Sequence, residues 1–351
     1  MNILHLHTEL KYSCGITRYL LTVCRSEQMQ HRYIVMVRAG EADQVLRNES
    51  INITFLSRTP GLFAVFSDLI RLVKVIRKYQ IQIIHSHHRY GDFLANLLRP
   101  FAGVRTITTV HSIVRGKRWL SYRSENILAV SNSVKQHLLS YFSIEEGKVI
   151  VLKNGIDPEL YNIREVKSRP DKIFTLGFIG RLSYEKGIDI LLQALRGLIN
   201  ERFEFKIVIA GSGEQESNVA EFQTEHPAYC EFIGSVRDIS PVYSEIDLFL
   251  LPSRIDPFPY VLLECGLFKL PVIAAAVDGI TELIDDGFTG RLIQPESVTA
   301  LKDEVVLAAN SKQVIKTWGE NLHAKVLSGY TAGLHIAALD EIYSRAVRED
   351  D

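Results

Sequence analysis

Residues 252–274, PSRIDPFPYVLLECGLFKLPVIA, are the most informative stretch of this chain. We expect a strand over 247–251 to lead into a turn that carries Asp256, and this turn to open a helix that carries Glu264 in its second turn. The first N–H groups of a helix lack intrahelical partners and the helix dipole adds partial positive charge, so this end can bind a phosphate. A carboxylate one turn further in can instead accept two hydrogen bonds from the cis-diol of a ribose. The stretch therefore suits a nucleotide diphosphate that carries a sugar.

An ordinary α/β domain also places a strand, a turn, a helix and an apolar strand in this order, and Glu264 could be a solvated helix residue. In the sequence, however, Glu264 lies among Val261, Leu262 and Leu263. Because an unpaired carboxylate in apolar surroundings is costly, this setting favours a binding site.

Length and composition indicate a soluble protein of two domains. The 351 residues are enough for two cores, and 46% hydrophobic with 23% charged residues is ordinary for a globular chain. The four cysteines lack the spacing of metal ligands, which predicts reduced thiols in a cytoplasmic protein. The N-terminus begins a strand at once and no stretch approaches about 18 uninterrupted apolar residues, so we expect neither a signal peptide nor a transmembrane helix.

The net charge of −1 conceals an asymmetry between the two halves. Residues 1–170 hold 24 Lys and Arg against 13 Asp and Glu, a balance of +11, whereas residues 171–351 hold 16 against 28, a balance of −12. Such a split favours an anionic partner for the first half. The alternative is that the charge of two solvated surfaces has merely drifted.

Strands and helices alternate along the whole chain, which predicts α/β domains with doubly wound parallel sheets. In the first half we expect strands near 2–7, 32–37, 81–85, 106–110, 126–130 and 148–152, and helices near 15–27, 63–79, 92–98 and 134–141. In the second half we expect strands near 174–180, 205–210, 231–233, 247–251, 271–274 and 290–293, and final helices near 298–309, 312–327 and 334–347.

The polar segment 161–172 breaks this alternation and marks the expected domain boundary. We therefore predict a Rossmann-like domain over 1–165, a second over 171–330, and a C-terminal helix over 331–351 that packs back toward the first domain. The two domains are expected to face each other, with a ligand site in the cleft between them.

A second loop carries two cations. FIGRLSYEKGID, residues 178–189, follows a predicted strand and opens a helix. Arg181 and Lys186 would lie at the end of that strand, where they could neutralise a diphosphate, and Gly180 and Gly187 would permit close backbone approach. The alternative is a polar loop with incidental charges.

These motifs resemble retaining glycosyltransferases of the GT-B fold, and family 4 most closely. The resemblance rests on GRLSYEKGID (180–189), the Asp256–Glu264 segment, and PVIA (271–274) through GITELI (279–284). It extends to VIVLKNGID (149–157) and TVH (109–111), so that it covers nearly the whole chain.

The resemblance implies roles for the residues of the second domain. The first of two acids separated by seven residues, here Asp256 in place of the usual Glu, would bind hydroxyls of the donor sugar, and Glu264 would bind the ribose. Asp256 reaches about one methylene less far than Glu. The residues between them usually offer backbone N–H groups to the donor; Pro257 and Pro259 have none, which leaves Phe258, Tyr260 and Val261.

In the first domain the resemblance implies a glycine loop that faces the phosphates, here Cys14-Gly15, with Cys14 where the family often has a second glycine. An ordinary helix start is the alternative for Gly15. Arg18 would touch the acceptor or lie on the surface. The resemblance places His111 beside the reacting sugar, although a polar core histidine is the more common explanation for such a residue.

Neither a metal nor a cofactor is expected. Histidines are numerous in the first half, but no carboxylate or cysteine completes a metal site with them, no Asp-x-Asp motif ends a strand, and the family normally needs no metal. The histidines concerned are His5, His7, His85, His87 and His88. The nucleotide sugar would be a co-substrate.

An anionic membrane surface is a further candidate partner. RGKRWL, residues 115–120, sets basic residues beside Trp119, which suits an anionic bilayer. The predicted helix 63–79 is also basic on one face, but a packed helix with a solvated face explains it better. The protein would then be cytoplasmic, or peripheral on the inner face of the membrane.

We conclude from the sequence that the chain is expected to be a nucleotide-sugar-dependent, retaining hexosyltransferase that acts on a glycan or lipid-linked acceptor, as in bacterial envelope or capsule assembly. A GT-B nucleotide-sugar epimerase and a non-catalytic glycan- or nucleotide-binding subunit stay open as alternatives. Nucleic-acid binding is not expected. The base, the sugar, the acceptor, the linkage and the oligomeric state are not encoded in these patterns.

Overall fold

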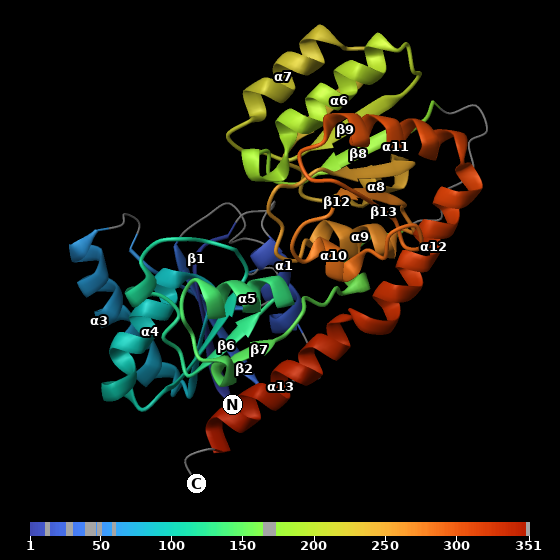
Figure 1. Cartoon of the computed structure of the whole chain (residues 1–351). Helices are drawn as coiled ribbons and strands as arrows, with labels where there is room; N and C mark the ends of the chain where they lie inside the picture. The colour runs from blue at the N-terminus through green and yellow to red at the C-terminus, as the bar shows by residue number, and fades with distance from the viewer. Residues whose placement is uncertain are drawn as a thin grey trace. The chain divides into compact units, whose positions relative to one another are not determined.

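The computed structural model describes residues 1–10, 15–25, 31–38, 47, 51–57, 61–163 and 173–348. The chain forms two compact units: Met1–Gly155 together with Ala332–Asp351, and Ile156–Thr331. Each unit is a parallel β-sheet flanked by helices, which confirms the predicted α/β class (Figure 1).

The described part of the first unit contains a seven-stranded sheet in the order β3-β2-β1-β4-β5-β6-β7, with every neighbouring pair parallel. Its strands are β1 (Asn2–Glu9), β2 (Arg32–Arg38), β3 (Asn52–Phe55), β4 (Ile83–Ser86), β5 (Arg105–Val110), β6 (Asn126–Ala129) and β7 (Val149–Val151). Its helices are α1 (Gly15–Arg25), α3 (Leu62–Tyr79), α4 (Arg89–Ala102), α5 (Asn132–Ser140) and α13 (Ala332–Arg348). The strand order reverses between β1 and β4. In open α/β sheets, ligands bind at the carboxyl ends of the strands at such a switch point.

The core of the first unit lies between the sheet and helices α3 and α4. Leu4, Ile34 and Ile84 from the strands pack with Leu72 of α3 and Leu94 of α4, and all five side chains are almost completely buried. Burying a side chain of this size contributes about 1.5–3 kcal/mol. This packing fixes which face of α3 points inward.

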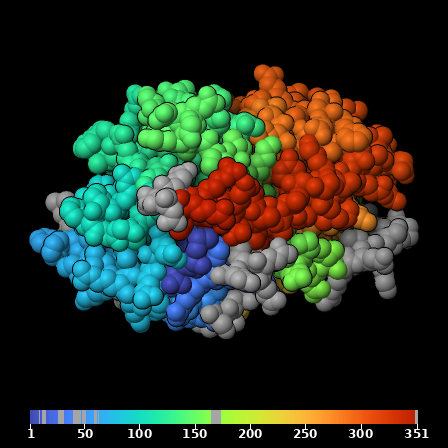
Figure 2. Space-filling model, turned by 90° about the horizontal axis from the view of Figure 1, so that it is seen from below, coloured from blue at the N-terminus to red at the C-terminus, as the bar shows by residue number. Residues whose placement is uncertain are grey.

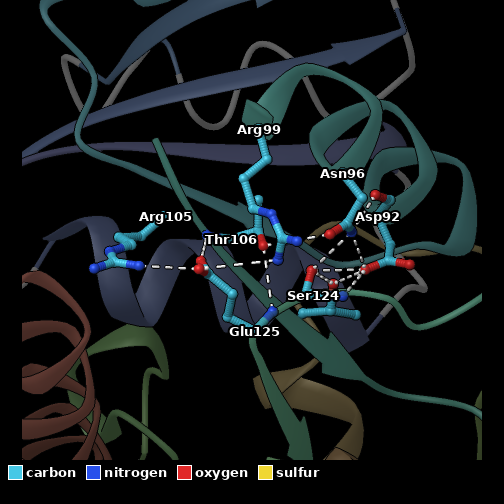
Figure 3. Close-up of polar contacts among 8 residues, drawn as sticks. Asp92, Asn96, Arg99, Arg105, Thr106, Ser124 and Glu125 are labelled. Atoms are coloured by element: carbon cyan, nitrogen blue, oxygen red, sulfur yellow. Dashed lines mark hydrogen bonds and ion pairs between the residues drawn. The ribbon is translucent and has the colours of Figure 1, made fainter. Parts of the chain in front are cut away.

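A buried carboxylate anchors α4 to the strands beside it (Figure 3). Asp92 is fully buried, and it accepts a hydrogen bond from the Ser124 hydroxyl at 2.7 Å. It also accepts from the Thr108 hydroxyl at 2.7 Å and from the Arg123 N–H at 2.9 Å. Because the carboxylate is satisfied inside the fold, the network has a structural explanation.

The C-terminal helix α13 belongs to the first unit. His335 in its first turn bonds to the carbonyl of Lys153 at 2.8 Å, and Tyr343 bonds to His85 at 2.6 Å. Figure 2 shows the red C-terminal residues at the surface beside the blue N-terminal segment, and α13 contacts α1.

The described part of the second unit contains a six-stranded parallel sheet in the order β10-β9-β8-β11-β12-β13, which reverses between β8 and β11. The strands are β8 (Thr175–Ile179), β9 (Lys206–Ala210), β10 (Cys230–Gly234), β11 (Leu248–Leu251), β12 (Val272–Ala275) and β13 (Arg291–Ile293). The helices are α6 (Ile188–Asn200), α7 (Glu216–Glu225), α8 (Ser240–Glu245), α9 (Tyr260–Leu267), α10 (Ile280–Leu283), α11 (Val298–Asn310) and α12 (Lys312–Gly329). A short 3-10 helix, η4, spans Tyr184–Lys186.

Three features differ from the sequence prediction or lie beyond the described residues. The first unit ends at Gly155 and not near residue 165, because Tyr161 is tied into the second unit by its hydrogen bond to Glu264. The short edge strand β3 was not predicted. Cys14 and most of the segment 161–172 lie outside the described residues.

Candidate active site

The loops at the switch point of the second unit are held close together. A Cβ atom on Gly187 would lie 2.0 Å from the carbonyl oxygen of Pro252, and Gly187 has a positive φ of 70°, so only glycine fits there. The N–H of Arg254 donates to the carbonyl of Glu185 at 2.7 Å. The loops that follow β8 and β11 are therefore in direct backbone contact.

Arg254 reinforces this contact with its side chain. Its two terminal nitrogens bond to the two carboxylate oxygens of Asp189 at 2.7 and 2.8 Å, and its Nε bonds to Glu296 at 2.6 Å. The guanidinium carbon lies 3.7 Å from the ring centroid of Tyr184. The hydrogen bond from Arg254 lowers the pKa of Asp189, and the same bond raises the pKa of Arg254. This clamp fixes η4, which carries Lys186.

Lys186 and Asp256 meet at the switch point. Lys186 Nζ lies 2.6 Å from Oδ2 of Asp256, and the Ser253 hydroxyl donates to the same oxygen at 3.1 Å. The two side chains are 18% and 3% exposed. The N–H of Asp256 donates to Asp278 at 2.9 Å, so a third loop, which follows β12, supports the pair. An ammonium has three donors, and Asp256 occupies one of them.

Arg181, the second predicted cation, is placed differently. Its side chain is 60% exposed and pairs with Glu185 at 2.9 Å. Exposed pairs of this kind contribute little to stability, so the guanidinium can be redirected to a ligand at small cost. Gly180, immediately before it, packs against the loop that follows β9, where a Cβ atom on Gly211 would lie 1.8 Å from the Gly180 carbonyl oxygen.

The predicted backbone donors lie at the start of α9. Phe258 and Tyr260 are buried, whereas Val261 is partly exposed. Tyr260 and Val261 occupy the first turn of α9, where N–H groups have no intrahelical acceptor. A Cβ atom on Gly279 would lie 1.8 Å from the Pro257 carbonyl oxygen, so the loop after β12 is pressed against this segment.

Glu264 is buried and engaged on both carboxylate oxygens. Tyr161 donates to Oε1 at 2.6 Å and Tyr243 donates to Oε2 at 2.5 Å. Burial, together with the neighbouring Glu264 charge, raises the pKa of Tyr243. The two hydroxyls explain how a carboxylate is tolerated among apolar residues.

The other predicted residues belong to the first unit. Gly15 begins α1, Arg18 lies in its first turn, and both are partly exposed. His111 follows β5 directly and is also partly exposed.

Histidines fill the switch point of the first sheet. His5 and His85 are register partners on β1 and β4. His5 Nδ1 lies 2.9 Å from His87 Nε2, and His87 Nδ1 lies 3.1 Å from His111 Nε2. His85 bonds separately, with Nε2 at 2.7 Å from the Thr109 hydroxyl and Nδ1 at 2.6 Å from the Tyr343 hydroxyl.

Burial keeps these imidazoles neutral. It lowers the pKa of His5 and of His111 to about 3, and it lowers the pKa of His85 and His87 well below the usual value. Within the described residues, His5, His85 and His87 have ligand atoms within 4.8 Å of one another, as a metal site would. Both His85 nitrogens are already hydrogen-bonded, so this geometry gives no support to a metal there. The absence of a metal stays a prediction.

Comparison with known proteins identifies the family. Residues 14–160 match the family described as Glycosyltransferase Family 4, and residues 173–310 match Glycosyl transferases group 1. The chain belongs to the glycosyltransferases of family 4, with a group 1 domain in its second half. The resemblance first indicated by its motifs is thereby confirmed.

Individual relatives are distant but extend over most of the chain. The chain is 24% identical to the capsular polysaccharide biosynthesis glycosyltransferase CapM of Staphylococcus aureus, over 95% of this chain and 98% of that protein. It is 23% identical to the Escherichia coli UDP-Gal:alpha-D-GlcNAc-diphosphoundecaprenol alpha-1,3-galactosyltransferase, over 82% and 81%.

Solved structures share the fold. HepE of Anabaena, crystallised in complex with UDP-glucose, matches with a TM-score of 0.85 and 21% identity, over 98% of this chain and 100% of that one. A glycosyltransferase from Rickettsia africae matches with a TM-score of 0.83 and 21% identity, over 99% and 98%. These glycosyltransferase neighbours, with the two parallel sheets, confirm the GT-B fold.

Several contributors to the site were not found by sequence reasoning. Arg254 is one of them. Tyr161, Tyr243, Ser253 and Asp278 carry no pattern that marks them, because each acts through a partner brought close only by folding. For Arg254 a weak signal was present, since it lies in the decisive stretch two residues before Asp256.

Proposed function

We propose that this glycosyltransferase moves a hexosyl group from a nucleotide diphosphate sugar to a hydroxyl of a glycan or lipid-linked acceptor, with retention of the anomeric configuration. The observation that carries the proposal is the partly buried Lys186–Asp256 pair at the switch point of the second unit. In this proposal the second unit holds the donor and the first holds the acceptor. No metal and no separate cofactor take part.

The residues of the second unit suit the parts of such a donor. One hydrogen of the Lys186 ammonium is directed to Asp256, which leaves two for phosphate oxygens. The first N–H groups of α9 add donors for the same anion, and the exposed Arg181 can turn toward it. Glu264, a carboxylate near the start of α9, would accept from the ribose hydroxyls. HepE, which was crystallised with UDP-glucose, makes UDP-hexoses the first donors to test.

These contacts support the following reaction. The bond between the anomeric carbon and the diphosphate oxygen breaks, while Lys186 and Arg181 offset the charge that grows on the leaving group. In this mechanism no carboxylate forms a covalent intermediate, because Asp256, the carboxylate beside Lys186, is bound to the cation. The acceptor hydroxyl would therefore attack the face that the diphosphate leaves, and a phosphate oxygen would take its proton.

An activity assay tests the proposal. The protein is incubated with UDP-, GDP- and ADP-hexoses, with and without polyprenyl-diphosphate-linked sugars, and products are followed by mass spectrometry and by NMR of the anomeric proton. Transfer that keeps the donor configuration is the expected result. Inversion would overturn retention, donor conversion without acceptor would indicate an epimerase, and binding without turnover would indicate a non-catalytic subunit.

We also propose that the first unit contacts an anionic membrane surface through the outward face of α3. The helix packs inward through Leu72 and Val75, but its outward face is not uniformly polar. Phe63 is 95% exposed, Phe66 is 69% exposed, and Ile70 continues the same stripe at helical spacing. Exposed apolar residues in a row mark an interaction surface more often than scattered ones do.

The outward face of α3 becomes basic toward the end of the helix, where it carries Arg71, Lys74, Arg77 and Lys78. The single acid of the helix, Asp68, is fully buried and accepts from the Tyr90 hydroxyl at 2.7 Å. Aromatic side chains with lysines and arginines are the composition of helices that lie in a membrane interface.

The loop 115–120 of the same unit also carries an exposed aromatic residue, Trp119, which is 74% exposed. No helix among the described residues is long and apolar enough to cross a bilayer.

Vesicle flotation tests this surface. Binding to vesicles that contain phosphatidylglycerol, with none to pure phosphatidylcholine, is the expected result, and salt should weaken it. The double variant Phe63→Ser/Phe66→Ser should abolish binding. Phe288→Ser is the matched control, since Phe288 is an exposed phenylalanine of the second unit. No binding at low salt, or equal binding by the double variant, would refute the surface.

A further inference from the structure

Three histidines of the first unit form one hydrogen-bonded chain. His5 is fully buried on β1, His87 is buried just beyond β4, and His111 is partly exposed just beyond β5. The two contacts join His5 Nδ1 to His87 Nε2 and His87 Nδ1 to His111 Nε2, at 2.9 and 3.1 Å. The chain thus leads from the interior of the sheet to the residue that the family resemblance placed beside the reacting sugar.

The hydrogen-bonded chain of histidines couples the tautomers of His5, His87 and His111. A neutral imidazole carries one N–H and one bare nitrogen, and each N···N contact needs one hydrogen. If His87 carries its hydrogen on Nδ1, it donates to His111, must accept from His5, and leaves His111 with its hydrogen on Nδ1. If His87 carries its hydrogen on Nε2, the opposite holds throughout. All three histidines therefore share one tautomer.

The buried end of the chain favours one direction. His5 Nε2 is buried and has no hydrogen-bond partner within the described residues. With the hydrogens on Nε2, a buried N–H group would lack an acceptor, and orphaned N–H groups are the rarer kind in folded proteins. With the hydrogens on Nδ1, the same atom is only a bare lone pair.

We propose that His5 and His87 are positioning residues that hold His111 in the tautomer with hydrogen on Nδ1, so that His111 presents a hydrogen-bond donor to an oxygen of the donor sugar. The reference to a sugar rests on the proposed function, whereas the tautomer does not. His111 then serves as a donor at Nδ1 and does not act there as a base. This tautomer of His111 follows from the two N···N contacts and from the neutrality of the three rings.

Nuclear magnetic resonance of the free protein tests the tautomer directly. Protein with 15N- and 13C-labelled histidine is compared with His5→Gln, His87→Gln and His111→Gln variants to assign the three rings at neutral pH. We expect hydrogen on Nδ1 in all three. Hydrogen on Nε2, or different tautomers along the chain, would overturn the proposal. The measurement needs no substrate, so it can fail while the proposed function holds, and the reverse.

Variants of the middle residue test its effect on the reaction. His87→Phe removes both contacts and should release His111 from the fixed tautomer, with kcat reduced about tenfold, as for the loss of one hydrogen bond, and with UDP affinity unchanged. His87→Gln should restore both the His111 tautomer and kcat, because one amide can accept from His5 and donate to His111.

The control is His85→Phe, which removes a buried imidazole of the same cluster whose two nitrogens bond to Thr109 and Tyr343. It should leave the His111 tautomer unchanged even if it lowers stability. An unchanged tautomer in His87→Phe, or an equal change in His85→Phe, would show that His87 does not position His111. If neither phenylalanine variant folds, the wild-type tautomer assignment still decides.

Discussion

The two sheets of this glycosyltransferase reverse their strand order in the same way but fill the switch point with opposite chemistry. In the second unit, Lys186 and the buried Asp256 form a partly buried ion pair between the loops after β8 and β11. In the first unit, His5 on β1, His85 on β4 and His87 just beyond β4 gather at the corresponding pair of strands as neutral, buried imidazoles. The strand order sets where a ligand can bind, and the side chains at that place decide whether it suits a charged ligand group or neutral hydroxyl groups.

The largest expected effect is on the charged switch point. Lys186→Ala removes the cation that would offset the leaving diphosphate, and kcat should fall about 100-fold or more. Arg181→Ala should act in the same direction. Steady-state transfer assays check this, with Lys325→Ala as the control, because Lys325 forms an ion pair with Asp285 elsewhere in the second unit. Near-normal turnover in both site variants would remove their assigned role.

The backbone contact beneath that pair can be broken separately. Gly187→Ala places a Cβ atom against the Pro252 carbonyl and forces a non-glycine residue into a positive φ. The backbone conformation alone should lower the free energy of unfolding by about 1–3 kcal/mol, and the clash should add to it. Gly287→Ala is the matched control, since Gly287 has a φ of 74° with nothing within 4 Å of its added Cβ. Equal denaturation midpoints would contradict the close approach.

The buried carboxylate of the second unit separates binding from stability. Glu264→Ala should weaken UDP binding by roughly 1–3 kcal/mol because its hydrogen bonds to the ribose are lost, as measured by calorimetry. Tyr243→Phe removes one protein partner of Glu264 and should lower stability while the carboxylate still binds nucleotide. If both variants bind UDP as the wild type does, Glu264 is a structural residue only.

The neutral switch point should be sensitive to acid. Burial lowers the pKa of His5 and His111 to about 3 and that of His335 to about 4, so between these values and about 6.5 the unfolded chain binds more protons. The contribution of these histidines to the stability of the first unit is therefore fully present above pH 6.5. As pH falls below this value, the free energy of unfolding should decline by up to about 1.4 kcal/mol per pH unit for each histidine.

Fluorine NMR of fluorotryptophan-labelled protein follows each unit separately, since Trp119 lies in the first and Trp318 in the second. Urea unfolding at pH 7.5 and pH 5 should shift the Trp119 signal to lower urea more than the Trp318 signal. Equal shifts would contradict the contrast between the two switch points.

The fold was predictable because its signal is local. Apolar strands, capped helices and their alternation fix the two parallel sheets. The meeting of Lys186 with Asp256 follows from the same logic, since both residues come after strands whose carboxyl ends share one edge. The family motifs pointed to the same two loops.

The partners of these residues were not predictable, because long-range contacts supply them. Tyr161 and Tyr243, which hold Glu264, are 103 and 21 residues away from it in the sequence. The histidine chain needs the pairing of β1 with β4, which brings His5 and His87 together across 82 residues. In the sequence these histidines resembled an incomplete metal site, and only the ring contacts distinguish a hydrogen-bonded chain.

A crystal structure with a UDP-hexose bound tests the central assignment most directly. The account predicts diphosphate oxygens within hydrogen-bond distance of Lys186 Nζ, at the carboxyl ends of β8 and β11, with the ribose at Glu264. A nucleotide bound elsewhere, or a saturated crystal in which Lys186 still contacts only Asp256, would contradict it.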